Sequence, residues 1–220
     1  MIKNPINGIG MTSQRTRDRM LNRLREQGIK DEITLAAMGE IPRHIFIDEA
    51  LSTRAYEDVS LPIGFGQTIS QPYTVAKMTE ILRAGSHLKK VLEIGTGCGY
   101  QTAVLSKVAN EVYSVERISP LLMKARNHLR ELRMRNIKLK HADGTMGLPE
   151  LAPFDGIIVT AAASHVPEDL LTQLEVGGRM VIPVGTEEQT LYLIERKDIH
   201  DYKQTKLEAV RFVPLLGGTS

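Results

Sequence analysis

The stretch from Val91 to Tyr100, VLEIGTGCGY, joins a short apolar run to three glycines at alternating positions. An apolar run that ends in glycine is typical of a buried strand, and the residues after Tyr100 have helical periodicity. Glycine has no Cβ, so the chain can turn sharply and a ligand can lie against the backbone. A strand, a glycine-rich turn and a helix in this order predict a nucleotide-like ligand at Gly95, Gly97 and Gly99.

The same loop lacks the marks of the two commonest phosphate-binding motifs. The dinucleotide fingerprint G-x-G-x-x-G requires glycine where this chain has Tyr100, and no Gly-Lys-Ser/Thr follows the loop. We therefore expect a ligand without a pyrophosphate contact, with a nicotinamide-type ligand as the less favoured alternative.

Three acidic residues follow three successive strand-like runs. Glu93 lies just before the loop, Glu116 ends the next run, and Asp143 with Gly144 ends the third. An acid at the position of Glu116 accepts hydrogen bonds from ribose hydroxyls. Three acids together would repel a pyrophosphate and attract the positive charges of S-adenosylmethionine. The alternative is a glycine-rich turn among scattered, solvated acids.

The order of strand-like and helix-like runs indicates the fold. Strand-like runs occupy residues 91–95, 111–116, 137–143, 156–162, 179–185, 189–197 and 206–215, and helix-like runs occupy 100–109, 119–133 and 167–174. Alternation of strands and helices predicts an α/β fold with a doubly wound, mostly parallel sheet, here of seven strands. The last two runs have no helix between them, so we expect them to form an antiparallel hairpin at one edge.

The first part of the chain differs from the rest. A polar helix is expected at 13–26, ended by Gly28, and a second helix begins at Asp31 and is stopped by Gly39. We predict an N-terminal helical extension over residues 1–85, which includes the stretch 67–72, and a ligand-binding domain over residues 86–220. The five arginines between residues 15 and 25 are expected to form a solvated face, with a nucleic-acid contact as the alternative.

Composition limits the possible partners and compartments. The chain has 220 residues, a formal net charge of +2 and one cysteine. A nearly neutral chain gives no reason to expect nucleic acid or an acidic membrane as a partner. A single cysteine cannot form an internal disulfide, which fits a cytoplasmic location. The six histidines show no metal-ligand spacing, so no metal is expected.

The stretch QTISQP, residues 67–72, is uncharged and carries two hydroxyls and two amides. It precedes a helix-like run at 73–82, and Gly64 and Gly66 lie before it, where hinge motion is possible. On its own it could be an ordinary capped loop. We also consider that it holds a substrate.

Several motifs together resemble one family. VLEIGTGCGYQTAVL, YSVERI, HADG and LEVGGRMVIPVG resemble class I S-adenosylmethionine-dependent methyltransferases. With QTISQPYTVA, IPRHIF and VRFVPLLGG added, the chain resembles the protein-L-isoaspartate O-methyltransferases from about residue 41 to residue 218. The resemblance implies a Rossmann-like sheet and transfer of a methyl group from S-adenosylmethionine to the free α-carboxylate of isoaspartyl residues in damaged proteins. Repair would then proceed through a succinimide.

The resemblance also assigns roles to residues. Ser70 matches the family's active-site serine. Thr68 and Gln71 belong to the same segment, residues 67–72, which would form the substrate wall. The backbone at Val213 would help to grip the substrate carboxylate, and Ala162 is small enough for a peptide to approach. The cofactor would contact Glu93, Gly95, Thr96, Gly97, Gly99, Glu116, Asp143 and Gly144. The expected partners are isoaspartyl proteins and peptides, and the chain is expected to act as a monomer.

Other residues and functions carry less weight. Cys98, inside the glycine loop, is expected to be a tolerated small side chain. His165 is expected at the rim of the cleft, with a substrate-side role as the alternative. Methylation of a small molecule or a nucleic acid is one alternative function, although the sequence TAAA after the fourth strand offers no aromatic ring for a flipped base. A binding module that keeps the fold without turnover is the other.

Overall fold

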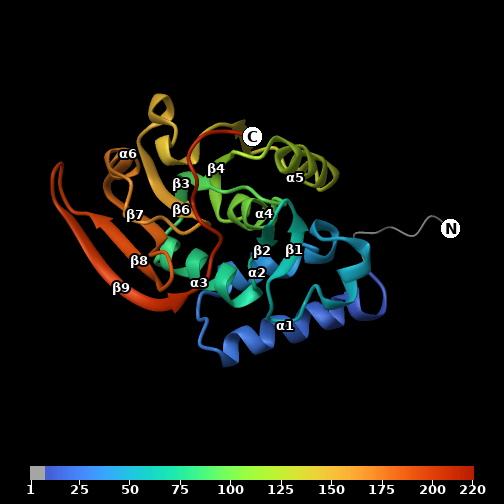
Figure 1. The fold of residues 1–220 in the computed structure, drawn as a ribbon. Helices are drawn as coiled ribbons and strands as arrows, with labels where there is room; N and C mark the ends of the chain where they lie inside the picture. Colours follow the sequence, from blue (N-terminus) through green and yellow to red (C-terminus); the bar gives the residue numbers. More distant parts are fainter. Residues whose placement is uncertain (1–7) are drawn as a thin grey trace.

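The computed structural model describes residues 8–220 and is shown in Figure 1. Within these residues, one sheet has seven strands in the order β5-β4-β3-β6-β7-β8-β9. The strands are β3 (Leu88–Ile94), β4 (Ala109–Glu116), β5 (Ile137–His141), β6 (Phe154–Val159), β7 (Leu174–Val184), β8 (Gln189–Arg196) and β9 (Tyr202–Val210).

The direction of the strands confirms the expected fold class. β5, β4, β3, β6 and β7 are mutually parallel, whereas β8 pairs antiparallel with β7 and β9 antiparallel with β8. β4, the next strand in the chain, lies on one side of β3, and β6 lies on the other side. Such a reversal of strand order opens a crevice at the carboxyl ends of the strands, which is where ligands bind in open α/β sheets.

Both faces of the sheet are covered. Side chains alternate along a strand, so Val91 and Leu92 point to opposite faces. Val91 packs in the core with residues of α3 (Pro72–Arg83), and Leu92 packs in the core that includes α6 (Glu168–Thr172). The other helices after β3 are α4 (Tyr100–Ser106) and α5 (Ser119–Glu131).

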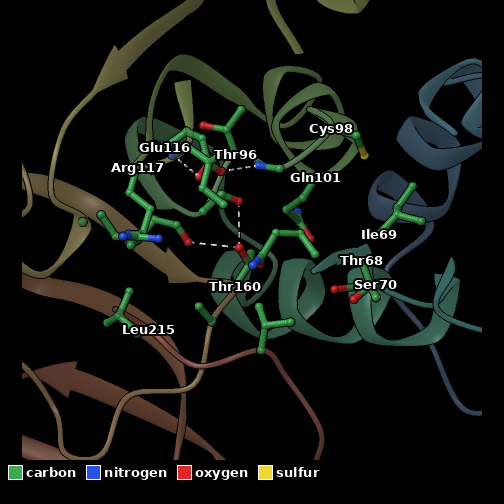
Figure 2. A pocket seen from close by; sticks show the side chains of 18 of the residues that line it. Thr68, Ile69, Ser70, Thr96, Cys98, Gln101, Glu116, Arg117, Thr160 and Leu215 are labelled. Carbon is green, nitrogen blue, oxygen red and sulfur yellow. Dashed lines mark hydrogen bonds between the residues drawn. The ribbon is translucent and has the colours of Figure 1, made fainter. Parts of the chain in front are cut away.

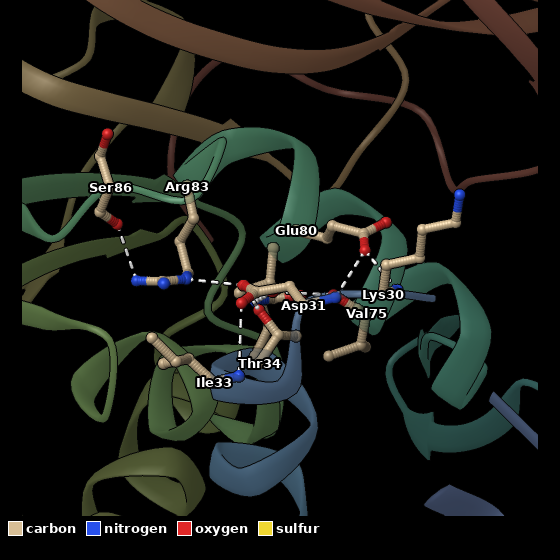
Figure 3. Close-up of polar contacts among 10 residues, drawn as sticks. Lys30, Asp31, Ile33, Thr34, Val75, Glu80, Arg83 and Ser86 are labelled. Atoms are coloured by element: carbon tan, nitrogen blue, oxygen red, sulfur yellow. Dashed lines mark hydrogen bonds and ion pairs between the residues drawn. The ribbon is translucent and has the colours of Figure 1, made fainter. Parts of the chain in front are cut away.

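An N-terminal layer lies beside α3 and contains α1 (Gln14–Glu26) and α2 (Glu32–Glu40). Figure 3 shows its polar anchor to α3. The buried Arg83 guanidinium donates to Asp31 at 2.7 Å. The Glu80 carboxylate accepts from the backbone N–H groups of Lys30 at 2.6 Å and of Asp31 at 2.8 Å. These bonds tie the start of α2 to the last turns of α3.

The basic helix is less solvated than expected. Within α1, Arg17 is buried and donates to the Gly39 carbonyl, and Arg23 donates to the Tyr56 carbonyl at 2.7 Å. These two side chains therefore hold the N-terminal layer together, while Arg15 and Arg19 are exposed.

A small hairpin occupies residues 61–69, so the first half of the stretch 67–72, which could have been an ordinary loop, is a strand. β1 (Leu61–Gly64) pairs antiparallel with β2 (Gln67–Ile69), and Pro72 then begins α3. The turn between the strands places Gly64, Phe65 and Gly66 at φ values of 94°, 55° and 69°. Glycine tolerates positive φ, so both glycines serve the turn.

Several predicted boundaries were wrong. Gly39 lies inside α2, which continues to Glu40. The helix expected at 100–109 ends at Ser106, because β4 already begins at Ala109. The strand expected at 137–143 ends at His141. β7 begins at Leu174 rather than at residue 179.

The largest correction concerns the end of the chain. The strand expected at 206–215 instead runs from Tyr202 to Val210. Residues 211–220, here called the C-terminal strap, leave the sheet and cross its carboxyl edge. Figure 1 shows the strap in red, passing from β9 toward α5. Pro214 has no N–H for a strand ladder, which disfavours a continuous strand through this segment. Short helical turns complete the described fold at Gly10–Thr12, Arg43–Phe46, Glu49–Arg54, Gly144–Met146 and Pro149–Leu151.

Candidate active site

A cavity lies at the carboxyl ends of β3, β4 and β6, at the predicted crevice (Figure 2). Three segments enclose it. They are the cofactor loop (residues 95–99), the hydroxyl segment (residues 67–71) and the C-terminal strap. The lining residues named as candidates from the sequence are Thr68, Ser70, Gly95, Thr96, Gly97, Glu116, Gly144 and Val213.

Gly95 is packed so closely that no side chain fits. Its φ is 98°, and a Cβ there would lie 2.3 Å from the Thr160 hydroxyl. That hydroxyl donates to the Gly95 carbonyl at 2.7 Å and lies 3.0 Å from the Ile94 carbonyl. Thr160 follows β6, so this contact fastens the cofactor loop to the neighbouring strand.

Glu116 is placed to hold both the loop and a ligand. Its Oε2 accepts from the Gly97 N–H at 2.8 Å, and its Oε1 accepts from the Ile118 N–H at 2.9 Å. Each carboxylate oxygen has a further lone pair. The side chain lines the cavity, so it can also accept hydrogen bonds from ligand hydroxyls.

The structure does not bring Glu93 to the cavity wall. Its side chain is fully buried beneath the loop, where Oε2 accepts from the hydroxyls of Thr102 and Ser114, each at 2.5 Å. Oε1 has no partner among residues 8–220. Burial raises the pKa of Glu93 to about 8, although the two hydroxyls act in the opposite direction. The fold therefore does not form the predicted ring of three acids around the ligand.

Asp143 and Gly99 also lie outside the cavity lining. Asp143 accepts from the Thr145 N–H at 2.9 Å and from the Gly218 N–H at 2.6 Å. Burial acts to raise the pKa of Asp143, but these hydrogen bonds outweigh it and leave the pKa below its ordinary value. Asp143 thus holds the strap in place. The φ of Gly99 is 92°, and a Cβ there would lie 3.2 Å from Ala125 of α5.

The hydroxyl segment presents alternate side chains to the cavity. Ile69 is buried in the core, while Thr68 and Ser70 face the cavity on either side of it in sequence. Figure 2 shows both hydroxyl side chains on the same wall. No hydrogen bond from the described part of the chain occupies either hydroxyl, so both are available to a ligand. Gln71 lies beside them in an adjoining groove.

The C-terminal strap completes the opposite wall. Ala162 donates from its N–H to the Val213 carbonyl at 2.8 Å, and its own carbonyl accepts from the Leu215 N–H at 2.7 Å. Ala162 itself is buried and positions the strap rather than lining the cavity. The Val213 N–H has no partner among residues 8–220 and remains an unused donor.

Sequence reasoning missed several lining residues. Thr160 is predicted only as part of the TAAA run. A hydroxyl side chain next to small residues at a strand end is the feature that could have indicated its place in the cavity wall. Ile118 and Leu215 line the cavity because of long-range packing, which no local pattern indicates.

Cys98 and His165 show no sign of a chemical role in this arrangement. Burial raises the pKa of the Cys98 thiol to about 11, so it is not a thiolate near neutral pH. His165 is exposed, lies 3.0 Å from the Ser164 hydroxyl, and lines neither the cavity nor the adjoining groove. Across residues 8–220, no group of three His, Cys, Asp or Glu side chains could hold a metal ion, and no helix is long and apolar enough to cross a membrane.

Comparison with known families gives a match over nearly the whole chain. The family model described as protein-L-isoaspartate(D-aspartate) O-methyltransferase matches residues 15–220. The protein-L-isoaspartate O-methyltransferase of Methylobacillus flagellatus is 78% identical, over 98% of each chain. That of Nitrosomonas eutropha is 62% identical, over 96% of each chain.

Solved structures agree with these sequence matches. A protein-L-isoaspartate O-methyltransferase structure superposes with a TM-score of 0.82 at 31% identity, covering 91% of this chain and 66% of the other. A putative enzyme of the same name from Plasmodium falciparum, solved with S-adenosyl-L-homocysteine, has a TM-score of 0.77 at 27% identity. That match covers 91% of this chain and 98% of the other.

Proposed function

We propose that the hydroxyl segment and the C-terminal strap grip the substrate carboxylate in this chain, which belongs to the protein-L-isoaspartate(D-aspartate) O-methyltransferase family. The activity is transfer of a methyl group from S-adenosylmethionine to isoaspartyl residues, the step that begins their repair. The observation that carries the proposed site is the pair of unused hydroxyls, Thr68 and Ser70, on the wall of the cavity.

The cavity fits the cofactor in two ways. The backbones of Gly95 and Gly97 line the cavity and carry no side chains, so a ligand can lie against the loop. The Glu116 carboxylate lines the same cavity and suits ribose hydroxyls. We propose Gly95, Thr96, Gly97, Glu116 and Gly144 as contact residues. Glu93, Gly99 and Asp143 support the contact residues from outside the cavity.

The chemistry requires positioning rather than a base. S-adenosylmethionine supplies an electrophilic methyl group when it is bound. The substrate's α-carboxylate has a reference pKa of about 3.5 and is already ionised at neutral pH. One carboxylate oxygen forms the new bond to carbon as the methyl–sulfur bond breaks, and no proton is transferred. Holding the reacting atoms in line therefore provides most of the rate enhancement.

Uncharged donors suit this task. The Ser70 hydroxyl and the unused Val213 N–H can hold one carboxylate oxygen while the other reacts. A lysine or arginine would bind the carboxylate more tightly and would also reduce its nucleophilicity. Gln71 lies in the adjoining groove, where it can contact the peptide next to the damaged residue. Ala162 contributes by fixing the strap that carries Val213.

The site is tested with two synthetic peptides that differ only in one isoaspartyl or one normal aspartyl linkage. We expect labelled methyl groups to enter the isoaspartyl peptide alone. In Ser70→Ala we expect kcat to fall about 10- to 100-fold, because a hydrogen bond to a charged group is worth roughly 1.5–3 kcal/mol. The dissociation constant for S-adenosylmethionine should stay within about twofold of wild type. Full activity in this variant would remove Ser70 from the mechanism.

We also propose that the chain works as a monomer in the cytoplasm, without a nucleic-acid partner. One chain supplies all three walls of the cavity, so the site needs no second subunit. Light scattering across a concentration series tests the monomer, and a mass above that of one chain would contradict it.

The division into an N-terminal extension (1–85) and a methyltransferase domain (86–220) is likewise a proposal.

A further inference from the structure

A second groove continues from the cavity on the far side of Ser70. It shares Thr68, Ser70, Thr160 and Val213 with the cavity and runs between the start of α3 and the end of β9. Its volume is about 650 Å³. Sites of ~300–1,000 Å³ enclose ligands much larger than one side chain. The groove is therefore large enough for the residues that flank the isoaspartyl residue in the substrate chain.

Two charged side chains line this groove, Glu208 on β9 and Arg211 at the beginning of the strap. Neither has an ion-pair partner in the described part of the chain, residues 8–220. Glu208 is half-buried, and its Oε2 accepts from the Tyr73 hydroxyl at 3.2 Å. A phenol donates a hydrogen bond but carries no positive charge, so the negative charge of Glu208 is not neutralised.

Tyr73 helps to keep this arrangement in place. Burial raises the pKa of the Tyr73 phenol, and the nearby Glu208 carboxylate raises it further. The phenol therefore keeps its proton and remains a donor. Tyr73 also donates from its backbone N–H to Asp58 at 2.8 Å, so its position is fixed from two sides. The carboxylate is thus held by a rigid neighbour at the groove wall.

Glu208 and Arg211 differ in how strongly they act on a bound peptide. Arg211 is exposed, so water and salt screen its charge. Glu208 is half-buried and held by a hydrogen bond, so its charge is less screened and better positioned. The remaining lining residues are uncharged. The groove consequently favours a cation over an anion near Ser70.

We propose that Glu208 selects isoaspartyl sites that carry a lysine or arginine next to the damaged residue. This inference rests on the proposed function, because it names which isoaspartyl substrates the same site prefers. The substrate's own α-carboxylate lies at Ser70, and the flanking cation lies in the groove against Glu208.

The test uses isoaspartyl peptides with alanine, lysine or glutamate beside the isoaspartyl residue, placed on either side in separate peptides. For wild type, we expect kcat/KM to be about three- to tenfold higher for lysine than for glutamate on at least one side, mainly through KM. Raising the ionic strength from about 0.05 M to about 0.5 M should reduce the ratio, since salt screens the ion pair.

Three variants locate the source of the preference. Glu208→Gln should lower the lysine-to-glutamate ratio to below about 2. Tyr73→Phe keeps the carboxylate but removes the hydroxyl that positions it, so its ratio should lie between those of wild type and Glu208→Gln. Glu187→Gln removes the same charge from the exposed turn between β7 and β8, and it should also keep the wild-type ratio.

The outcomes separate this inference from the proposed function. A wild-type ratio near 1, or a Glu208→Gln ratio equal to that of wild type, would overturn the role of Glu208. In either case the alanine-flanked isoaspartyl peptide would still be methylated, so the proposed function would stand. No methylation of that reference peptide would instead overturn the proposed function itself.

Discussion

The two walls of the active-site cavity are built in different ways. The wall proposed for the cofactor, here called the cofactor wall, arises within one strand–loop–helix unit, β3, residues 95–99 and α4. Thr160 and Glu116 fasten it from the adjacent strands. The wall proposed for the substrate, here called the substrate wall, joins the hydroxyl segment, in the first third of the chain, to the C-terminal strap. Long-range contacts hold the strap in place: Ala162 binds it on both sides of Pro214, and Asp143 accepts from the Gly218 N–H.

This difference shows which parts of the site depend on local sequence and which depend on the whole fold. The cofactor loop keeps its shape through positive φ angles and short contacts within the sheet. The hydroxyl segment precedes α3, and α3 is held by the N-terminal layer. Damage to distant packing should therefore affect the substrate wall first, and substitutions in the loop should affect cofactor binding first.

The largest effect is expected where the N-terminal layer is anchored. Asp31→Ala would leave the Arg83 guanidinium, whose side chain is 2% exposed, without its carboxylate. Breaking a buried ion pair by removing one partner costs about 3–5 kcal/mol. We expect the free energy of unfolding, measured with urea, to fall by that amount.

The neighbouring residue provides a matched control for this variant. Glu32 forms an ion pair with Arg25 at 2.8 Å, but both side chains are largely exposed. Glu32→Ala should leave the urea midpoint close to that of wild type, because exposed pairs contribute little. If Asp31→Ala and Glu32→Ala behaved alike, the anchor in Figure 3 would not be what attaches this layer.

The next largest effect is a pH dependence of stability caused by Glu93, the buried acid under the cofactor loop. The pKa of Glu93 is raised by burial from the ordinary value of 4.5 to about 8, so the folded state keeps a proton that the unfolded chain releases. The resulting stability is complete below pH 4.5 and is lost as pH rises through about 8. Between pH 5 and pH 8, this loss is about 3 kcal/mol in the free energy of unfolding.

Glu93→Gln is uncharged throughout this range and should lack the decline. Urea unfolding at pH 5, 6.5 and 8 measures this decline. The free energy of unfolding of the variant should rise relative to that of wild type as pH rises. Glu175→Gln, at an exposed position on β7, is the control that should follow wild type. Parallel pH profiles for wild type and Glu93→Gln would show that Glu93 is ionised in the folded protein.

A third effect separates the two walls directly. Gly95→Ala would place a Cβ 2.3 Å from the Thr160 hydroxyl at a φ of 98°. Backbone strain of about 1–3 kcal/mol, together with this clash, should weaken S-adenosylmethionine binding by about 100-fold, measured by calorimetry. Gly66→Ala also has positive φ, but open space surrounds it in the hairpin turn. That variant should bind the cofactor with an affinity within about twofold of wild type, and equal losses in both would contradict the distinction.

Sequence alone predicted the seven strands and the strand–loop–helix unit around residues 95–99 because their signals are local. The seven strands, the glycine positions and the acid at Glu116 follow from runs of fewer than about ten residues. Glu93 shows the limit of such reasoning. It shares a face of β3 with Val91, and successive side chains alternate, so it points under α4 instead of toward the end of the strand. Attention to that alternation would have placed it in the core.

The substrate wall was less predictable because its contacts are long-range. VRFVPLL has the apolar composition of a strand, and only Pro214 indicates that the ladder ends. The contacts that decide the path of the strap, from Ala162 and Asp143, come from residues far away in the chain. The roles proposed for Thr68 and Ser70 rest on the family resemblance, since an uncharged segment of this kind would otherwise fit an ordinary loop.

The smallest effect isolates the anchor of the strap. Leu215→Pro and Leu215→Ala both remove the side chain that lines the cavity, but only proline also removes the N–H that donates to Ala162 at 2.7 Å. A buried hydrogen bond contributes about 0.5–1.5 kcal/mol, and its loss leaves the Ala162 carbonyl without its partner. We therefore expect kcat/KM for an isoaspartyl peptide to be up to about tenfold lower in Leu215→Pro than in Leu215→Ala. Equal values in the two variants would mean that apolar contacts alone hold the strap, and the substrate wall would then depend on packing in the same way as the core.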